Sequence, residues 1–371
     1  MSQPVSPAGL ALDALSRHLE SAGVPVAAPL RAEIVTGGRS NLTYRVTDGS
    51  SRWILRRPPL GELMPGTHDV SREYRVLGAL AKTAVPVPEV VLLCRDPEVI
   101  GAPFYLMKEV PGVVLRTPEE VAVLPPAECE RLSAALVDTL ADLHLLDYAE
   151  VGLSDLGRPA GYLERQLRRW VRQYRTIEVR SLPAVDTIAA ALGRRVPDNP
   201  YASVIHGDYR LDNVMVTADD PRRIAAVLDW EMATLGDPLA DLATLVMFWD
   251  EPGRPPNPIT GGLTAAPGFF DRATVIERYV SRMGLAVDDV DWYLVFAQFR
   301  LAVILEQIHA RELAGQAPEH DGARVGDMVP AILDAALADM ERSPRLRPLV
   351  RRDGGAHRRT SKRATSKRTG Q

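Results

Sequence analysis

A run of polar residues between two aliphatic stretches carries the groups that could do chemistry in this sequence. The segment VIHGDYRLDNVMV, residues 204–216, holds Asp208, Arg210 and Asn213, and the later apolar run RIAAVL delivers Asp229 at its end. If Asn213 and Asp229 came together, they would offer the amide and carboxylate oxygens that Mg²⁺ prefers, with substrate phosphates as further ligands. Asp208 would then stand nearby as a carboxylate free of the metal.

This division of roles suits phosphoryl transfer. Such a reaction needs a metal on the phosphates, a base or orienting group at the hydroxyl nucleophile, and a cation that offsets the developing charge. We therefore predict that Asp208 orients or deprotonates an acceptor hydroxyl while Asn213 and Asp229 hold Mg²⁺. Arg210, two residues after Asp208, is placed to be the cation.

The order and spacing of these residues resemble a known superfamily. His-Gly-Asp at 206–208 followed by Asn213 has the spacing of the protein-kinase catalytic loop, with glycine in the second place. Asp229 ends the next apolar run, and Gly-Asp-Pro follows at 236–238. The set resembles the aminoglycoside phosphotransferase and choline kinase superfamily. The resemblance implies a protein-kinase-like, two-lobed α+β fold that uses ATP and Mg²⁺, with a small β-rich N-terminal lobe and a larger, mainly helical C-terminal lobe.

The resemblance also implies roles for individual residues. Asp208 would be the catalytic base and His206 would brace its loop. The stretch TGGRSNLTYRV resembles the hairpin that covers the phosphates, and FYLMKEV resembles the strand into the hinge whose backbone meets adenine. The implied nucleotide contacts are Gly37, Gly38, Ser40 and Asn41 in the hairpin and Met107, Glu109 and Val110 at the hinge.

A carboxylate on an apolar helix face predicts an ion pair in the N-terminal lobe. Helical spacing in DVSREYRVLGALAK places Glu73 on one face with Val70, Leu77 and Leu80, so the acid requires a cationic partner. By resemblance that partner stands on the strand WILRR, where the general pattern has lysine and this sequence offers Arg56. Arginine is planar and permanently charged, so the exchange alters the contact with phosphate. The branch of the superfamily that we favour tends to carry arginine there.

Longer stretches indicate this branch. They are ILRRPPLGELMPGTHDVSREYRVLGAL, DPEVIGAPFYLMKEVPG and VGLSDLGRPAGYLERQLRRWVRQY. Together they resemble the kinase-like domain fused to acyl-CoA dehydrogenases in animals, and its stand-alone bacterial relatives. The resemblance implies that a hydroxyacyl-CoA or hydroxy acid receives the γ-phosphoryl group, and it suggests a functional partnership with an acyl-CoA dehydrogenase.

The surrounding elements follow from periodicity and turn signals. The expected strands are AEIVTG, LTYRVTDG, SRWILRR, EVVLLCRD and FYLMKEVPG, after which the pattern is mainly helical. Asp48-Gly49 is a hairpin signal between the second and third of them. The expected divisions are an N-terminal helix at 1–24, a nucleotide-binding lobe at 25–110, a catalytic helical lobe at 111–345 and a basic disordered tail at 346–371.

Other acceptors and functions stay open at this point. Residues 230–237 are too few for the activation segment that holds a peptide substrate, so a small-molecule hydroxyl fits better. An aminoglycoside would require an acidic pocket for its ammonium groups, and choline would require an aromatic cage. The helix GYLERQLRRWVRQYR carries arginines beside aromatics that could meet the phosphates of a CoA ester. An inactive, nucleotide-binding scaffold is a further alternative.

Composition indicates a cytoplasmic protein. The formal net charge is -4, and the basic stretch after residue 350 is interpreted as a solubilising tail, with nucleic-acid binding ranked last. Cys94 and Cys129 are too few for a disulfide framework and favour a reducing compartment. The apolar run at 292–310 is interrupted by Arg300 and Glu306, so we expect a buried helix and no membrane partner.

Overall fold

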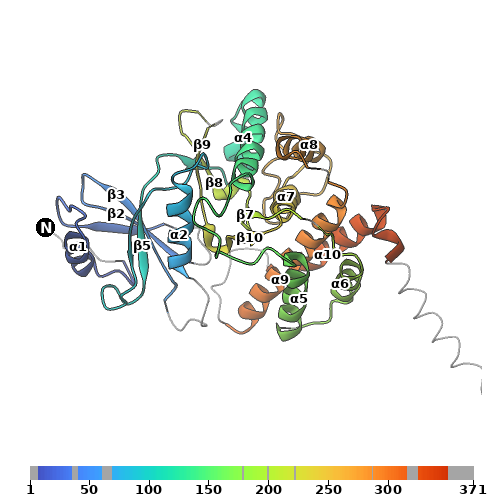
Figure 1. The fold of residues 1–371 in the computed structure, drawn as a ribbon, viewed down its shortest axis with the longest axis horizontal. Coiled ribbons are helices and arrows are strands. Elements are labelled where there is room, and N and C mark those ends of the chain that lie inside the picture. The colour runs from blue at the N-terminus through green and yellow to red at the C-terminus, as the bar shows by residue number, and fades with distance from the viewer. Residues whose placement is uncertain are drawn as a thin grey trace, which may run out of the picture.

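The computed structural model describes residues 7–35, 41–60, 69–177, 179–198, 200–220, 223–285, 287–315 and 325–349. These residues form a small lobe built on a β-sheet and a larger, mainly helical lobe (Figure 1). The predicted phosphate contacts Gly37, Gly38 and Ser40 lie outside the described residues, as do residues 350–371 of the predicted tail. Of the tail predicted at 346–371, the structure describes residues 346–349, and Leu346 is buried in the core.

The N-terminal lobe is built on a five-stranded antiparallel sheet, with strand order β1-β2-β3-β5-β4. Its strands are β1 (Arg31–Ile34), β2 (Leu42–Thr47), β3 (Arg52–Arg57), β4 (Val90–Cys94) and β5 (Phe104–Lys108). All five were predicted from strand-like apolar runs and turn signals. The turn between β2 and β3 is held by Asp48, whose carboxylate accepts hydrogen bonds from the amides of Ser50 and Ser51 at 2.9 and 2.6 Å. This is the hairpin that the Asp-Gly pair predicts.

Two helices cover opposite faces of this sheet (Figure 1). Helix α1 (Leu12–Ser21) buries Leu15 and Leu19 in a core that includes Phe104 and Leu106 of β5. Helix α2 (Val70–Leu80) packs on the other face, where Tyr105 and Met107 of the same strand point. Because successive side chains of a strand alternate between faces, β5 contributes to both cores.

Two consecutive arginines of β3 also lie on opposite faces of the sheet. Arg57 is 4 % exposed, and its guanidinium donates to the carbonyls of Ile100, at 2.9 Å, and of Gly9 just before α1. Tyr44 of β2 donates to the carbonyl of Ala8 at 2.6 Å. The segment leading into α1 is therefore fastened to the sheet by polar contacts, while Arg56 faces α2 and the second lobe.

The C-terminal lobe is a set of helices around two small β-sheets. Its longer helices are α4 (Pro126–His144), α5 (Tyr162–Ile177), α6 (Pro183–Arg194), α7 (Pro238–Met247), α8 (Arg272–Met283), α9 (Val290–Leu313) and α10 (Val325–Arg342), and a short α3 (Pro118–Ala122) precedes them. The strands are β6 (Val113–Val114), β7 (Ser203–Ile205), β8 (Val214–Val216), β9 (Ile224–Val227) and β10 (Thr234–Gly236), paired as β6-β8-β9 and β7-β10. The loops that leave β7 and β9 carry the predicted catalytic and metal-binding residues.

Helices α7 and α9 form the centre of this lobe. Asp237 caps α7 by accepting a hydrogen bond from the amide of Leu239 at 2.9 Å, and Pro238 is the first helical residue, as the Gly-Asp-Pro motif predicts. Helix α9 is buried along much of its length, as expected for the 292–310 run. Its buried Glu306 is paired with Arg180 at 2.7 Å, which explains how an acid is tolerated there.

Among the described residues, no helix is both long and apolar enough to cross a membrane.

The burial of α1 generates a stability prediction. Leu15 is fully buried between α1 and the sheet, so Leu15→Ala should lower the free energy of unfolding by about 2–5 kcal/mol through lost transfer energy and a residual cavity. Chemical denaturation would measure the change. Val123, which is 79 % exposed, provides the control, and Val123→Ala should change stability by about 0.5 kcal/mol or less. Equal effects of the two substitutions would show that α1 does not contribute to the folded core.

Candidate active site

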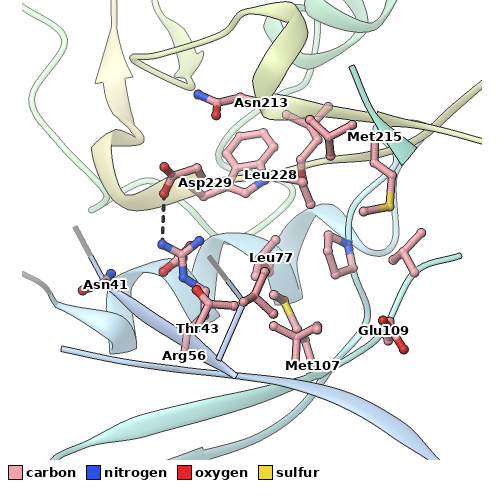
Figure 2. A pocket seen from close by; sticks show the side chains of 18 of the residues that line it. Asn41, Thr43, Arg56, Leu77, Met107, Glu109, Asn213, Met215, Leu228 and Asp229 are labelled. Atoms are coloured by element: carbon pink, nitrogen blue, oxygen red, sulfur yellow. Dashed lines mark hydrogen bonds and ion pairs between the residues drawn. The ribbon is translucent and has the colours of Figure 1, made fainter. Parts of the chain in front are cut away.

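A cavity of about 330 Å³ lies between the two lobes (Figure 2). Its lining draws on the N-terminal sheet, on α2, and on the loops around β8 and β9. Eight residues predicted to contact nucleotide or metal line it together: Asn41, Arg56, Glu73, Met107, Glu109, Val110, Asn213 and Asp229. His206, Asp208 and Arg210 do not line the cavity and lie in the adjoining loop after β7.

Arg56 links the two lobes across this cavity. Its Nη1 lies 3.1 Å from Glu73 Oε1, which confirms the pairing expected from the position of Glu73 on the apolar face of α2. Its Nη2 lies 3.0 Å from Asp229 Oδ1, as the dashed line in Figure 2 marks. Arg56 and Glu73 are 11 % and 2 % exposed, so little water screens the pair. The planar guanidinium therefore holds one carboxylate from each lobe.

The surroundings of this cluster shift the pKa values of its members. Burial raises the pKa of Glu73 above its ordinary value, and the positive charge of Arg56 acts in the opposite direction. Burial alone would lower the pKa of Arg56, but the negative charges of Glu73 and Asp229 outweigh it and hold that pKa above its usual range. Arg56 therefore remains a permanent cation at the centre of the site.

Asp229 reaches this cluster through an unusual backbone conformation. Its φ and ψ are both 63°, in the left-handed region, and it is the one non-glycine residue with positive φ among those the structure describes. Aspartate tolerates this region better than most residues, but the conformation still costs about 1–2 kcal/mol. Such a cost persists where the surroundings impose it, often at functional sites. Here the turn presents the Asp229 carboxylate to the cavity.

The loop after β7 is held by hydrogen bonds among its own residues. Asn213 Nδ2 donates to Asp208 Oδ2 and to the Asp208 carbonyl, both at 2.9 Å. His206 Nε2 lies 2.7 Å from the carbonyl of Leu228, and the Asp208 amide donates to His206 Nδ1 at 3.2 Å. This pattern fits a neutral imidazole protonated at Nε2. His206 thus ties the loop to the segment before Asp229, in line with the expected bracing role.

A buried carboxylate from α7 anchors the same loop. Asp241 accepts hydrogen bonds from the amides of His206, at 2.6 Å, and Gly207, at 2.8 Å. Its Oδ2 lies 3.4 Å from His144 Nε2, and His144 Nδ1 lies 2.6 Å from the Tyr279 hydroxyl. Burial opposes ionisation of Asp241, but its contact with His144 and the hydrogen bond from the Gly207 amide lower its pKa. Asp241 therefore has a structural role, and the segment that it supports is the loop that carries Asp208.

Arg210 is already engaged with carboxylates. Its Nη1 lies 3.0 Å from Asp212 Oδ2, and its Nε lies 3.4 Å from Asp208 Oδ2. Its guanidinium carbon lies 4.8 Å from the centre of the Phe248 ring. Asp212 was not singled out from the sequence, because acids in polar loops are usually solvated. Arg210 thus positions Asp208 as well as supplying positive charge.

The residues present fit a magnesium ion. Asp229 offers a carboxylate that is 37 % exposed, and Asn213 uses its nitrogen for Asp208, which leaves its amide oxygen for a cation. These are hard oxygen donors, and Mg²⁺ is usually held by few protein ligands together with water and substrate phosphates. The described residues contain no cluster of three or more His, Cys, Asp or Glu that could form a protein-only metal cage.

The hinge beside β5 has fewer available amides than its sequence suggests. Lys108 donates its amide to the Glu89 carbonyl at 2.8 Å, and Glu109 donates to the Arg52 carbonyl at 3.2 Å. The Glu109 carboxylate is also engaged, at 2.5 Å from Arg45 Nε. Val110 is the next residue along, and proline, which has no amide hydrogen, follows it. Val110 is therefore the hinge residue whose amide could meet a ligand.

The apolar floor of the cavity was missed by sequence reasoning. Met215, Leu228 and Trp230 line it from the C-terminal lobe. Gly112 brings the chain close to this floor, because an added Cβ would lie 2.5 Å from the carbonyl oxygen of Val216. The sequence of a short apolar strand does not indicate which side chains face a ligand. These residues can therefore be identified only from the way in which the two lobes pack together.

Comparison with known sequences was made with this geometry in hand. The model of the phosphotransferase enzyme family matches residues 31–273. Acyl-CoA dehydrogenase family member 10 of Mus musculus is 33 % identical over 330 residues, which cover 87 % of this chain and 30 % of that protein. Acyl-CoA dehydrogenase family member 11 of Homo sapiens is 33 % identical over 326 residues, which cover 87 % of this chain and 42 % of that protein. The chain spans less than half the length of these curated relatives.

Solved structures show the same similarity. A crystal structure from Ralstonia eutropha, of a protein proposed to be an aminoglycoside phosphotransferase, is 34 % identical with a TM-score of 0.77, covering 88 % of this chain and 97 % of that one. A thermostable mutant of an aminoglycoside phosphotransferase, in a ternary complex with AMP-PNP and hygromycin B, is 16 % identical with a TM-score of 0.59 over 88 % of this chain and 98 % of that one. At that identity the second likeness concerns the fold alone.

The ion pair between Arg56 and Glu73 predicts a pH-dependent loss of stability in a variant. Arg56→Gln removes one partner of a buried pair, which typically costs about 3–5 kcal/mol. Because the folded-state pKa of Glu73 is raised, its stabilising contribution is present at low pH and is lost as the pH rises through that pKa. Without Arg56 this pKa rises further, so the stability lost on substitution should grow as the pH rises from below the ordinary pKa of a glutamate carboxyl to neutral pH and above. Denaturant unfolding at each pH would measure it.

The control is the double variant Arg56→Gln with Glu73→Gln, which has no ionisable group at position 73. Its stability relative to the wild type should vary much less with pH than that of the single variant. A single variant whose deficit is flat across this range would show that Glu73 is not the titrating group.

Proposed function

This chain belongs to the phosphotransferase enzyme family, and on that premise we propose that it transfers the γ-phosphoryl group of ATP to a hydroxyl of a small molecule. The observation that carries the proposal is the position of Asp208. Its carboxylate is hydrogen-bonded to Asn213, which lines the cavity between the lobes, but Asp208 itself lies outside that lining. A nucleotide in the cavity and an acceptor beside Asp208 would therefore meet at Asn213.

We assign nucleotide binding to residues 25–110 and catalysis to residues 111–345. The adenine would lie between Met107 and Met215, near the amide of Val110, and the phosphates would point towards Arg56 and the metal ligands. Bound Mg²⁺ would neutralise phosphate charge and orient the γ-phosphoryl group. Asn213 and Asp229 are the residues that would hold it.

Asp208 is oriented to receive a proton. Its recorded side-chain contacts, with Asn213 Nδ2 at 2.9 Å and Arg210 Nε at 3.4 Å, use Oδ2, which leaves Oδ1 for the acceptor hydroxyl. As the acceptor oxygen bonds to the γ-phosphorus, the bond to the bridging oxygen of ADP breaks and the hydroxyl proton passes to Asp208. Arg56 stays charged throughout and offsets negative charge on the phosphates.

A hydroxyacyl-CoA or hydroxy acid is the acceptor that we favour. The support is that curated relatives are named acyl-CoA dehydrogenase family members and match this chain over less than half of their length. Their remaining length has room for a further activity, so a functional partnership with an acyl-CoA dehydrogenase is part of the proposal. The buried, unbridged Cys94 and Cys129 favour a cytoplasmic location.

Loss of Asp208 should separate nucleotide binding from transfer. Asp208→Ala should bind ATP with little change, because its side chain does not line the cavity, and should lower transfer by about 10²- to 10⁴-fold. ADP release with ATP and Mg²⁺ would measure it, across a 4-hydroxyacyl-CoA, the free hydroxy acid, an aminoglycoside and choline. The matched control is Asp219→Ala, which removes an exposed acid from the turn after β8. Near-normal turnover by Asp208→Ala would refute the assignment.

Asp229→Ala should have a different effect. It removes a proposed metal ligand and the second carboxylate of Arg56, so we expect Mg²⁺-dependent nucleotide binding to be abolished. Calorimetric titration with ATP, with and without Mg²⁺, would detect the loss. ADP release with none of the acceptors, despite ATP binding by the wild type, would favour an inactive scaffold or another acceptor.

A further inference from the structure

Arg300 lies against the loop that carries Asp208 and forms no ion pair with a carboxylate among the residues that the structure describes. Arg300 of α9 donates through Nη2 to the carbonyl of Gly207, one residue before Asp208. The same nitrogen lies 3.5 Å from Met232 Sδ, in the turn that follows Asp229. Arg300 therefore contacts both loops that carry the proposed catalytic groups, and it does not line the cavity between the lobes.

A second arginine lies over the same aromatic ring as Arg300. The guanidinium carbon of Arg300 lies 5.7 Å from the centre of the Trp170 ring, and that of Arg169 lies 5.4 Å from it. Trp170 is 4 % exposed and fixed in the core, whereas Arg169 is exposed on α5. An aromatic face attracts a cation, so the buried indole favours a position close to its ring for both guanidinium groups.

Neither arginine has a carboxylate within ion-pair distance among the described residues. In the described part of the chain, Arg169 and Arg300 form no ion pair with a carboxylate, whereas Arg56 and Arg210 form two each. The recorded hydrogen bonds of Arg300 use Nη2, so the donors on Nε and Nη1 are left for another partner. An uncompensated positive charge thus lies one residue from the proposed base.

We propose that Arg300 and Arg169 bind an anionic group of the acceptor while Asp208 engages its hydroxyl. This inference rests on the proposed function and narrows its substrate class to hydroxyl compounds that carry a carboxylate or phosphate. Guanidinium groups bind both anions through paired, charge-assisted hydrogen bonds. A polycationic aminoglycoside would be repelled at the same place, so the charge also selects against that class.

Among the described residues, Arg300 has a hydrogen bond to the loop and Arg169 has none, and this separates two sources of the anion. Arg300 contacts Gly207, so an anion bound to Arg300 would be separated from the acceptor hydroxyl by a short carbon chain, as in a free hydroxy acid. Arg169 is on the exposed surface of α5 beside the further exposed arginines Arg168 and Arg172, where the phosphates of a longer CoA thioester would reach.

The test is calorimetric binding of acceptors to the full chain saturated with AMP-PNP and Mg²⁺. The ligands are 4-hydroxypentanoate, its CoA thioester, its neutral N-acetylcysteamine thioester and an aminoglycoside. The proteins are the wild type, Arg300→Gln, Arg300→Lys, Arg169→Gln and the control Arg131→Gln, which removes an exposed arginine from α4. Arg300→Gln could disturb the loop through loss of the Gly207 contact. Arg300→Lys is included because it keeps the positive charge at this position.

We expect Arg300→Gln to lower the binding affinity for an anionic acceptor by about tenfold to a hundredfold, as for loss of a charged hydrogen bond. Arg300→Lys should recover part of this affinity. If the anion is a CoA phosphate, Arg169→Gln should weaken the CoA thioester alone. Arg131→Gln should change nothing, and the neutral thioester should bind the same to all variants. Anion affinities unaffected at both positions, no binding of either anion, or tighter binding of the aminoglycoside would overturn the inference.

ADP release by the same proteins distinguishes this inference from the proposed function. Arginine-dependent binding of an anion without any phosphorylation would refute the proposed function and support the anion site. Phosphorylation of the anionic acceptors with equal kcat/KM in the wild type and both glutamine variants would support the phosphotransferase and refute the anion site.

Discussion

The ion pairs of Arg56 are the interaction on which the site depends, because they join the two lobes. One guanidinium contacts Glu73 on α2 and Asp229 in the C-terminal lobe, at 3.1 and 3.0 Å. Removing either acid would leave a buried charge partly unpaired, which is costly in a water-poor interior. The relative placement of the lobes, and with it the shape of the cavity, is therefore coupled to the charge state of this cluster. A phosphate that competes for Arg56 would act directly on the link between the lobes.

The polar loop after β7 is stable because many of its polar groups form hydrogen bonds with the surrounding core. The Asp241 carboxylate accepts hydrogen bonds from two backbone amides of the loop, and His206 donates a hydrogen bond to the carbonyl of Leu228. Asn213 then binds the Asp208 carboxylate on the front. Catalytic geometry of this kind is set by rigid supporting residues, since a loop without them would sample many orientations. The left-handed backbone of Asp229 depends on the same rigid surroundings, because a strained conformation persists only where packing imposes it.

Sequence patterns predicted the family, the five strands and the pairing of Glu73 with Arg56, because each has a local signature. Apolar alternation marks a strand, and an acid on an apolar helix face implies a cation. The contact of Arg56 with Asp229 joins residues that are 173 apart in the chain, and no local pattern announces it. The placement of Arg300 over Trp170 depends on how α5 and α9 pack. These parts of the site belong to tertiary structure alone.

Strand β3 shows how closely the outer surface and the site are tied. Arg56 faces Glu73 and Asp229, and the next residue, Arg57, fastens the segment before α1 on the opposite face. A shift of one residue in strand pairing would exchange the two faces, placing Arg57 in the cleft and Arg56 beneath α1. Both positions would still hold an arginine, so the exchange would conserve charge while misplacing every aliphatic neighbour on the strand. Over evolutionary time, insertions or deletions in the turn between β2 and β3 should be tolerated only when they leave the strand register, and with it the face that each arginine occupies, unchanged.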